Sequence, residues 1–297
     1  MSRKALDRKL CRELFEKEGS VVGVHRALKA RGINVIYGTV RRALKETGGE
    51  RQTKSRFPSN FDPARIAKLP PIDSAALVDR TTLYPSTVVR QGMPQNLLKS
   101  GYNSSKIGGQ VLKGKWKGMP IYTLTLEERA TCPTSCHHWR SCFGNKMHLA
   151  QRISHKAPGF ANALVADVER LGREHPDGFV VRLHVLGDFF SVPYVKLWEA
   201  MLDNVLALRV FGYTARWDAQ NDPIARALVA LTMRRWERFA MRFSDAPIDE
   251  CATVSIEHPV QAPGDAIVCP EQMGKTESCS TCGLCWQSRR RVAFLQH

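Results

Sequence analysis

The stretch of sequence that decides the fold is FVVRLHVLGDFFSVPYVKLWEAMLDNVLALRVFGYT, residues 179–214. Residues 179–188 and 206–214 are short apolar runs rich in valine and leucine, and each predicts a buried strand. Residues 192–202 lie between them and predict a helix. A strand, a helix and a second strand in this order are typical of a parallel sheet with helices packed on it.

The same alternation continues on both sides of this unit. IYTLTL at 121–126 predicts a strand before it, and PIARALVALTMRRW at 223–236 predicts a helix after it. Two more strands are predicted at 238–245 and 251–258. Residues 119–297 are therefore expected to form an α/β domain, a partial or open parallel β/α barrel.

Several of these strands end in polar residues. In parallel β/α folds, ligand and catalytic sites collect at the carboxyl ends of the strands. The sequence therefore predicts a pocket at this edge of the sheet. Its candidate residues are His184, Asp188, Tyr213, Arg216 and Ser244. The alternative is that Asp188 and Asp245 only cap the helices that follow them.

The nine cysteines of the chain carry the strongest chemical signal. The N-terminus has no apolar signal segment, so a cytoplasmic location is expected, where thiols stay reduced and structural disulfides are disfavoured. Seven of the nine fall in two groups, which favours metal ligation. Two single residues, Cys11 and Cys251, are expected to be buried core thiols.

The second group lies in VCPEQMGKTESCSTCGLCW, residues 268–286, and consists of Cys269, Cys279, Cys282 and Cys285. Its C-x2-C-x2-C spacing places three thiolates around one small volume, as cubane clusters require, and Cys269–Pro270 resembles the more distant ferredoxin ligand. We therefore expect a [4Fe–4S] cluster. Zinc and unligated reduced thiols remain the alternatives, although structural zinc usually takes two separate C-x2-C knuckles.

The first group, Cys132, Cys136 and Cys142, follows the strand at 121–126. Three cysteines after the first strand of a β/α sheet resemble radical S-adenosylmethionine enzymes, in which a C-x3-C-x2-C loop leaves one iron open for the cosubstrate. Here the spacing is C-x3-C-x5-C, and Trp139 stands at the third ligand position. The resemblance is partial, and it implies that Gly187 and Asp188 would receive the amino group of S-adenosylmethionine.

The N-terminal segment is strongly basic. Residues 1–56 hold 15 Lys and Arg against 6 Asp and Glu, a net charge of +9 out of +16 for the whole chain. Residues 1–47 are predicted to form three short helices in a helix-turn-helix arrangement, which favours DNA binding. The candidate DNA-binding residues are Tyr37, Thr39, Arg41, Arg42 and Lys45. The alternatives are a helical bundle used for protein contacts and a solvated basic surface.

Two further segments connect the predicted domains. Residues 48–58 are predicted to be a polar linker, and residues 59–118 an irregular basic segment. No stretch of the sequence approaches the about 20 apolar residues that a membrane span needs, so a membrane is not an expected partner.

Three long strings make the chain similar to the "gene product 88" family of actinobacterial phages and mobile elements. They are KGKWKGMPIYTLTLEERATCPTSCHHWRSCFGNKM, RLHVLGDFFS and CPEQMGKTESCSTCGLCW, within residues 100–297. The resemblance implies a phage or plasmid context but no activity. The leading expectation is an iron–sulfur, DNA-binding protein whose cluster is structural or redox-sensing. A radical S-adenosylmethionine-like enzyme and a zinc-stabilised DNA-binding protein are the alternatives.

Overall fold

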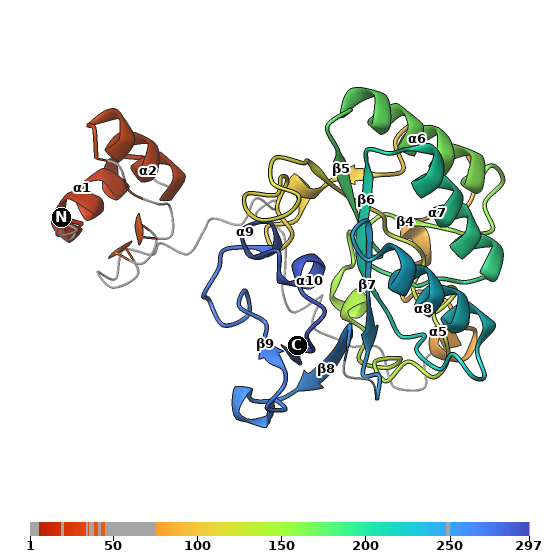
Figure 1. The fold of residues 1–297 in the computed structure, drawn as a ribbon. Helices are drawn as coiled ribbons and strands as arrows, with labels where there is room; N and C mark the ends of the chain where they lie inside the picture. The colour runs from red at the N-terminus through yellow and green to blue at the C-terminus, as the bar shows by residue number, and fades with distance from the viewer. Residues whose placement is uncertain are drawn as a thin grey trace. The chain divides into compact units, whose positions relative to one another are not determined.

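The computed structural model divides the chain into two compact units, Met1–Arg65 and Ile66–His297 (Figure 1). The residues that the structure describes are 6–18, 21–33, 35, 39–40, 43–44, 75–247 and 250–296. No helix within these residues is long and apolar enough to cross a membrane.

The N-terminal unit contains two described helices, α1 (Arg8–Glu18) and α2 (Val21–Ala30). The apolar residues of each helix recur at helical spacing and lie together in a small core. The buried members of this core are Cys11, Leu14, Val24, Leu28, Val40, Ala43 and Leu44. Helix α2 ends before Gly32, whose φ of +74° is the left-handed conformation that commonly closes a helix.

The second unit is built on an eight-stranded sheet in the order β2-β3-β5-β6-β7-β8-β10-β9. Only the β2–β3 pair is antiparallel, and the described strands form an open sheet rather than a closed barrel. The expected α/β class with an open, largely parallel sheet is therefore confirmed. The strands are β2 (Lys99–Ser100), β3 (Ile121–Thr123), β5 (Phe179–Leu183), β6 (Leu208–Thr214), β7 (Phe239–Ser244), β8 (Ala252–Ile256), β9 (Ile267–Val268) and β10 (Val292–Leu295).

The two faces of this sheet are covered differently. Helices α6 (Phe160–Glu174), α7 (Val192–Asn204) and α8 (Pro223–Arg235) lie on one face, and the short helices α9 (Cys279–Cys282) and α10 (Leu284–Gln287) lie on the other (Figure 1). Consecutive residues of a strand point to opposite faces, so each strand supplies side chains to both layers.

The face that carries α10 has an aromatic core of its own. The ring of Trp286 packs on Phe211 of β6 with ring centres 4.6 Å apart, and it is stacked on Trp116 at 5.7 Å. Both tryptophans are almost fully buried. The register pairs Arg182 with Phe211, so Arg182 points to the same face. This face therefore holds the cysteine-bearing helices against the sheet.

The helices that follow β5 and β6 are capped by residues other than the strand-end aspartates. The Ser191 hydroxyl accepts from the Tyr194 backbone N–H at the start of α7, and the Asp222 carboxylate does the same for Ile224 at the start of α8. Asp188 therefore does not cap α7, and no described helix follows Asp245 directly. The capping alternative for these two residues is wrong.

The described part of the segment 59–118 belongs to the α/β unit. Leu97 and Leu98 are buried in its core, and β2 pairs with β3. The basic residues Lys106 and Lys115 form ion pairs with Glu271 and Glu237. The remaining short elements are α5 (Ala75–Val78), η1 (Pro85–Thr87), β1 (Val88–Val89), η2 (Gly101–Asn103), η3 (Phe143–Lys146), β4 (Arg152–Ile153) and η4 (Pro259–Gln261).

Candidate metal centre

The loop that carries the first cysteine group lies along the carboxyl ends of the parallel strands. At the end of β5, the Asp188 backbone N–H donates to the Thr131 hydroxyl at 3.1 Å. Nε2 of His138 lies 2.9 Å from the Ser255 hydroxyl in β8 and 3.7 Å from the Asp245 carboxylate after β7. The loop therefore spans the strand ends where the sequence places the polar residues.

A buried ion pair fixes the second half of this loop. The Arg152 guanidinium and the Glu128 carboxylate are both fully buried, and Arg152 Nε donates to Glu128 at 2.6 Å. Arg152 also donates to the backbone carbonyls of Gly144, Met147 and Ala150 at 3.1, 3.1 and 2.7 Å. A buried ion pair persists only when its remaining hydrogen bonds are satisfied, and here they are satisfied by the loop itself.

A second buried arginine holds the chain between Cys136 and Cys142. Arg129 has a φ of +62° and donates to the Trp139 carbonyl at 3.2 Å and to the Asn145 side-chain oxygen at 2.5 Å. The Asn145 amide donates to the Arg140 carbonyl at 2.8 Å. The insertion that makes the second gap five residues long is therefore an ordered turn. The Trp139 ring lies 5.9 Å from the Arg80 guanidinium.

The thiols of the first group are largely buried and lie near negatively charged carboxylates. Burial raises the pKa of Cys132 and Cys136, the latter to about 11, and the nearby Asp188 carboxylate raises both further. The pKa of Cys142 is raised by burial and then by the Glu128 carboxylate. Each thiol is thus neutral unless a cation compensates the thiolate, which is what a bound metal does.

The Asp188 carboxylate ties β5 to β6 at this edge. It accepts from the Phe189 backbone N–H and the Thr214 hydroxyl, both at 2.7 Å, and from the Ala215 backbone N–H at 2.8 Å. Burial nevertheless raises the pKa of Asp188 to about 6. Its two oxygens are therefore already engaged in holding the strand ends together.

The second cysteine group sits on the opposite face from α6–α8 and is joined to the sheet by its backbone. The Cys279 N–H donates to the Lys106 carbonyl at 2.8 Å, and the Cys269 N–H donates to the Ala293 carbonyl of β10 at 2.8 Å. Between α9 and α10, Gly283 adopts a φ of +69°, which allows the chain to turn sharply between Cys282 and Cys285.

Arg242 of β7 anchors the end of this loop. It is fully buried and donates to the carbonyls of Cys285, Arg290 and Leu284 at 3.0, 2.9 and 3.4 Å, and also to that of Ser288. Leu284 and Cys285 lie in α10, and Ser288 and Arg290 follow it. The last carbonyls of a helix lack a full set of partners within the helix and need donors from elsewhere. One guanidinium therefore satisfies four backbone acceptors around Cys285.

Tyr213 and Arg182 complete the surroundings of this group. The Tyr213 hydroxyl donates to Sγ of Cys285 at 2.9 Å. The Arg182 guanidinium lies 4.5 Å from the centre of the Tyr213 ring and donates to the carbonyls of Leu183 and His184. No carboxylate of the described residues forms an ion pair with Arg182. Burial lowers the pKa of Arg182, because the cation is taken from water without an anionic partner.

The two groups of thiols suit a metal centre in residue type and in spacing along the chain, but their sulfur atoms are not close enough to bind one metal ion as they stand. Among the described residues, no three His, Cys, Asp or Glu side chains are close enough to hold one metal ion. Burial raises the pKa of Cys279 to about 12 and also that of Cys269, and in both cases the neighbouring Cys285 thiol adds to the effect. A metal would have to draw these neighbouring sulfurs closer.

The five residues of the predicted pocket do not face one cavity. His184 packs against the Tyr194 hydroxyl at 3.0 Å, and burial lowers its pKa to about 3. Tyr213 faces Cys285, and Arg216 forms an ion pair with Asp222 at 2.7 Å. Asp188 is buried at the strand ends, and Ser244 is half-buried at the end of β7. None of the five lines either of the two cavities described in this unit.

Of the predicted DNA-binding residues, only Thr39 is described, and it lies half-buried in a helical segment. Tyr37, Arg41, Arg42 and Lys45 lie outside the described residues. The two single cysteines, Cys11 and Cys251, are fully buried, which confirms their expected place in the cores.

Sequence reasoning missed the arginines that hold the two cysteine loops. Arg182 and Arg242 lie inside the apolar strands FVVRL and FAMRFS. A charged residue within an apolar run indicates a buried charge that needs a polar partner, so the sequence did carry a signal for these two. Arg152 gave no comparable signal.

Comparison of the chain with family models, with curated proteins and with solved structures found no match.

Proposed function

We propose that this chain is a DNA-associated protein that binds an iron–sulfur cluster, and that the cluster stabilises the fold or senses oxidants. The observation that carries the proposal is the Arg182 guanidinium beside the thiols of Cys279 and Cys285. A half-buried cation without a carboxylate partner is costly, and neutral thiols do not relieve that cost. Thiolates that ligate a metal cluster would supply the missing negative charge.

The spacing of the second group favours iron over zinc. We propose that Cys279, Cys282, Cys285 and Cys269 are the ligands of a [4Fe–4S] cluster, because three cysteines in consecutive C-x2-C spacing suit a cubane. The Tyr213 hydroxyl would then donate a hydrogen bond to a ligand sulfur, which is one of the features that set the potential of such a cluster. Cys132, Cys136 and Cys142 form a separate candidate ligand set at the strand ends.

The metal is identified by its content and absorbance. We expect anaerobically purified full-length protein to contain iron and acid-labile sulfide in equal amounts, with a broad visible absorbance that bleaches on reduction. Zinc without sulfide would contradict the iron assignment and support the zinc-stabilised alternative. Protein without metal after anaerobic reconstitution with iron and sulfide would contradict both.

S-adenosylmethionine chemistry is the weaker proposal for the first group. Trp139, held in an ordered turn, occupies the position where the third ligand of the C-x3-C-x2-C motif is expected, and the third cysteine is Cys142 instead. The Asp188 oxygens already accept three hydrogen bonds. A structural or sensing role for the cluster leaves the contacts of Trp139 and the hydrogen bonds of Asp188 as they are. The phage or plasmid context stays a proposal that rests on the resemblance alone.

The proposed DNA association rests on the N-terminal unit. Its net charge of +9 over residues 1–56 and the close packing of α1 on α2 support a small basic helical module. The helix expected to read DNA carries Arg41 and Arg42. Non-specific attraction by a basic surface is the simpler form of the same proposal.

We expect an Arg41→Ala, Arg42→Ala variant of the full chain to bind duplex DNA more weakly. Each lost phosphate contact should lower the slope of log affinity against log salt by about one. Fluorescence anisotropy with a labelled duplex at several salt concentrations measures both effects. Arg12→Ala is the matched control, because Arg12 is exposed on α1 and pairs with Glu16. Equal losses in the two variants would contradict a specific role for the predicted third helix.

A further inference from the structure

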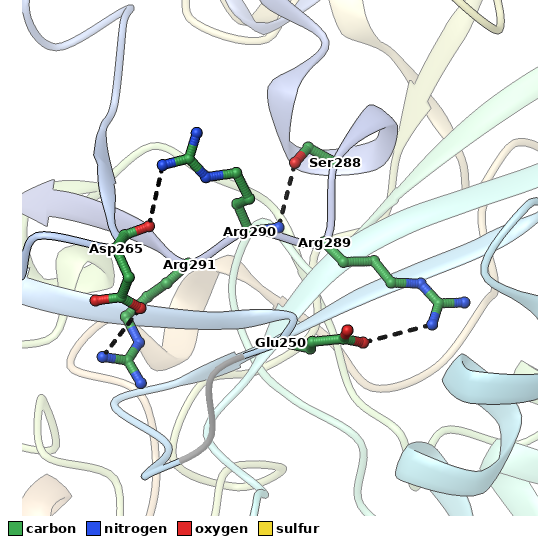
Figure 2. Close-up of a pocket in the computed structure, with 6 residues that line it drawn as sticks. All are labelled: Glu250, Asp265, Ser288, Arg289, Arg290 and Arg291. Atoms are coloured by element: carbon green, nitrogen blue, oxygen red, sulfur yellow. Dashed lines mark hydrogen bonds and ion pairs between the residues drawn. The ribbon is translucent and has the colours of Figure 1, made fainter.

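A cavity of about 350 Å³ lies at the amino-terminal ends of β8, β9 and β10 (Figure 2). Its lining residues are Glu250, Asp265, Ser288, Arg289, Arg290 and Arg291. The segments that supply them precede the three strands, whereas the first cysteine group lies at the carboxyl ends of the sheet. The cavity is therefore separate from that group.

The cavity carries an excess of positive charge that is weakly compensated. Arg289 pairs with Glu250 at 3.6 Å and Arg291 pairs with Asp265 at 3.5 Å, and these two carboxylate side chains are 65% and 50% exposed. Long ion pairs contribute little where water reaches them, as it reaches both carboxylates and the 39% exposed Arg289 side chain, whereas the Arg291 side chain is only 18% exposed. An anionic ligand with several oxygens can therefore compete for these guanidinium groups.

Arg290 is the cation in excess. Its side chain is exposed, and its guanidinium contacts the backbone carbonyl of Asp265 at 3.4 Å. No carboxylate of the described residues forms an ion pair with it. An uncharged carbonyl at the limit of hydrogen-bond distance leaves most of its donors available.

The three guanidinium groups do not converge on one point. Figure 2 shows Arg289 extending toward Glu250, while Arg290 and Arg291 lie on the side of Asp265. A single phosphate would be bound by donors that meet around it, whereas charges spread along a strip match the repeated phosphates of a polynucleotide backbone.

The backbone beneath these side chains is held firmly. Arg242 binds the carbonyls of Ser288 and Arg290, and the Arg289 carbonyl accepts from the Cys251 N–H at 2.6 Å. The Arg289 guanidinium also lies 5.5 Å from the centre of the Trp236 ring. A fixed backbone lowers the entropy lost when the side chains bind a ligand.

We propose that the strip Arg289–Arg291 binds the phosphate backbone of a nucleic acid, so that the α/β unit contacts the polymer independently of the N-terminal unit. The proposal extends the DNA association proposed above, and it requires no metal. The second cavity described in this unit, about 380 Å³, provides a contrast, because its charged lining residues are one acid and one base, Glu169 and Arg173.

The test compares Arg290→Gln with Arg173→Gln in the full chain. Both changes remove one exposed guanidinium, but Arg173 lies in the last turn of α6 and lines the second cavity. We expect Arg290→Gln to weaken binding of labelled duplex and single-stranded DNA by about three- to tenfold near 0.1 M salt, and to lower the salt slope by about one. Arg173→Gln should change neither quantity. Equal effects of the two changes would overturn the proposal.

Two further arms separate this contact from the N-terminal one and from a site for a single anion. Adding Arg290→Gln to the Arg41→Ala, Arg42→Ala variant should weaken DNA binding again by the same factor, because independent contacts add. No further loss in the triple variant would overturn the proposal, whatever the N-terminal unit does. Inorganic phosphate that competes at millimolar concentration, with an unchanged DNA salt slope in Arg290→Gln, would identify a single-anion site and also overturn it.

Discussion

We expect a Cys285→Ser variant to lose the metal of the second cysteine group and to unfold far more easily than the parent protein. Metal-binding energy is folding energy in such sites, and structural zinc in small peptides supplies about 10–16 kcal/mol. Even a fraction of that amount is large against a typical domain stability of about 5–15 kcal/mol. The free energy of unfolding of the α/β unit should therefore fall by about 3 kcal/mol or more. Denaturant unfolding measures this change, and the metal content is measured on the same samples.

The matched control for this change is Cys251→Ala, which removes a fully buried thiol from the same unit. It should keep the metal and cost only about 1–2 kcal/mol, as small core substitutions do. Cys279→Ser and Cys282→Ser should behave like Cys285→Ser, whereas Cys11→Ala should leave the metal content unchanged. Full metal in all three serine variants would show that the ligand assignment is wrong.

The second large effect is expected from Arg242→Met. The substitution keeps a long apolar side chain but removes the donors for the carbonyls of Cys285, Leu284, Ser288 and Arg290. Buried carbonyls without partners are expensive, and we expect the free energy of unfolding of the α/β unit to fall by about 3–5 kcal/mol. Metal occupancy should fall as well, because the segment carrying Cys285 is no longer held against β7.

Arg235→Met on α8 is the control for Arg242→Met. Arg235 is exposed and pairs with Asp203 at 2.7 Å, so its loss should cost less than about 1 kcal/mol. Thermal or denaturant unfolding of the two variants, with metal content measured on the same samples, provides the comparison. Similar unfolding curves for the two variants would mean that Arg242 does not hold the cysteine loop.

Local patterns in the sequence were sufficient for the central strands of the sheet and the helices between them, but they did not predict β9 and β10 at its edge. The runs at 179–188, 206–214 and 238–245 contain the strands β5, β6 and β7, and the helix predicted at 223–236 contains α8. Apolar periodicity and chain order determine these elements, because each must bury one face and its neighbour lies next to it in the sheet. The grouping of the cysteines was equally visible, since it depends on spacing along the chain.

The partners of the buried charges were decided only by the tertiary structure. Nothing local connects Arg242 with the carbonyls around Cys285, or Tyr213 with the Cys285 thiol, since these contacts join residues more than 40 positions apart. The five predicted pocket residues were likewise separated by the fold, because His184 turns into the aromatic core and Tyr213 toward the cysteine loop. The sequence by itself therefore determined the elements and the chemical types at the candidate metal centre. The packing of the sheet decided which side chains meet, because the side of a sheet on which a strand-end residue lies depends on register and on what covers each face.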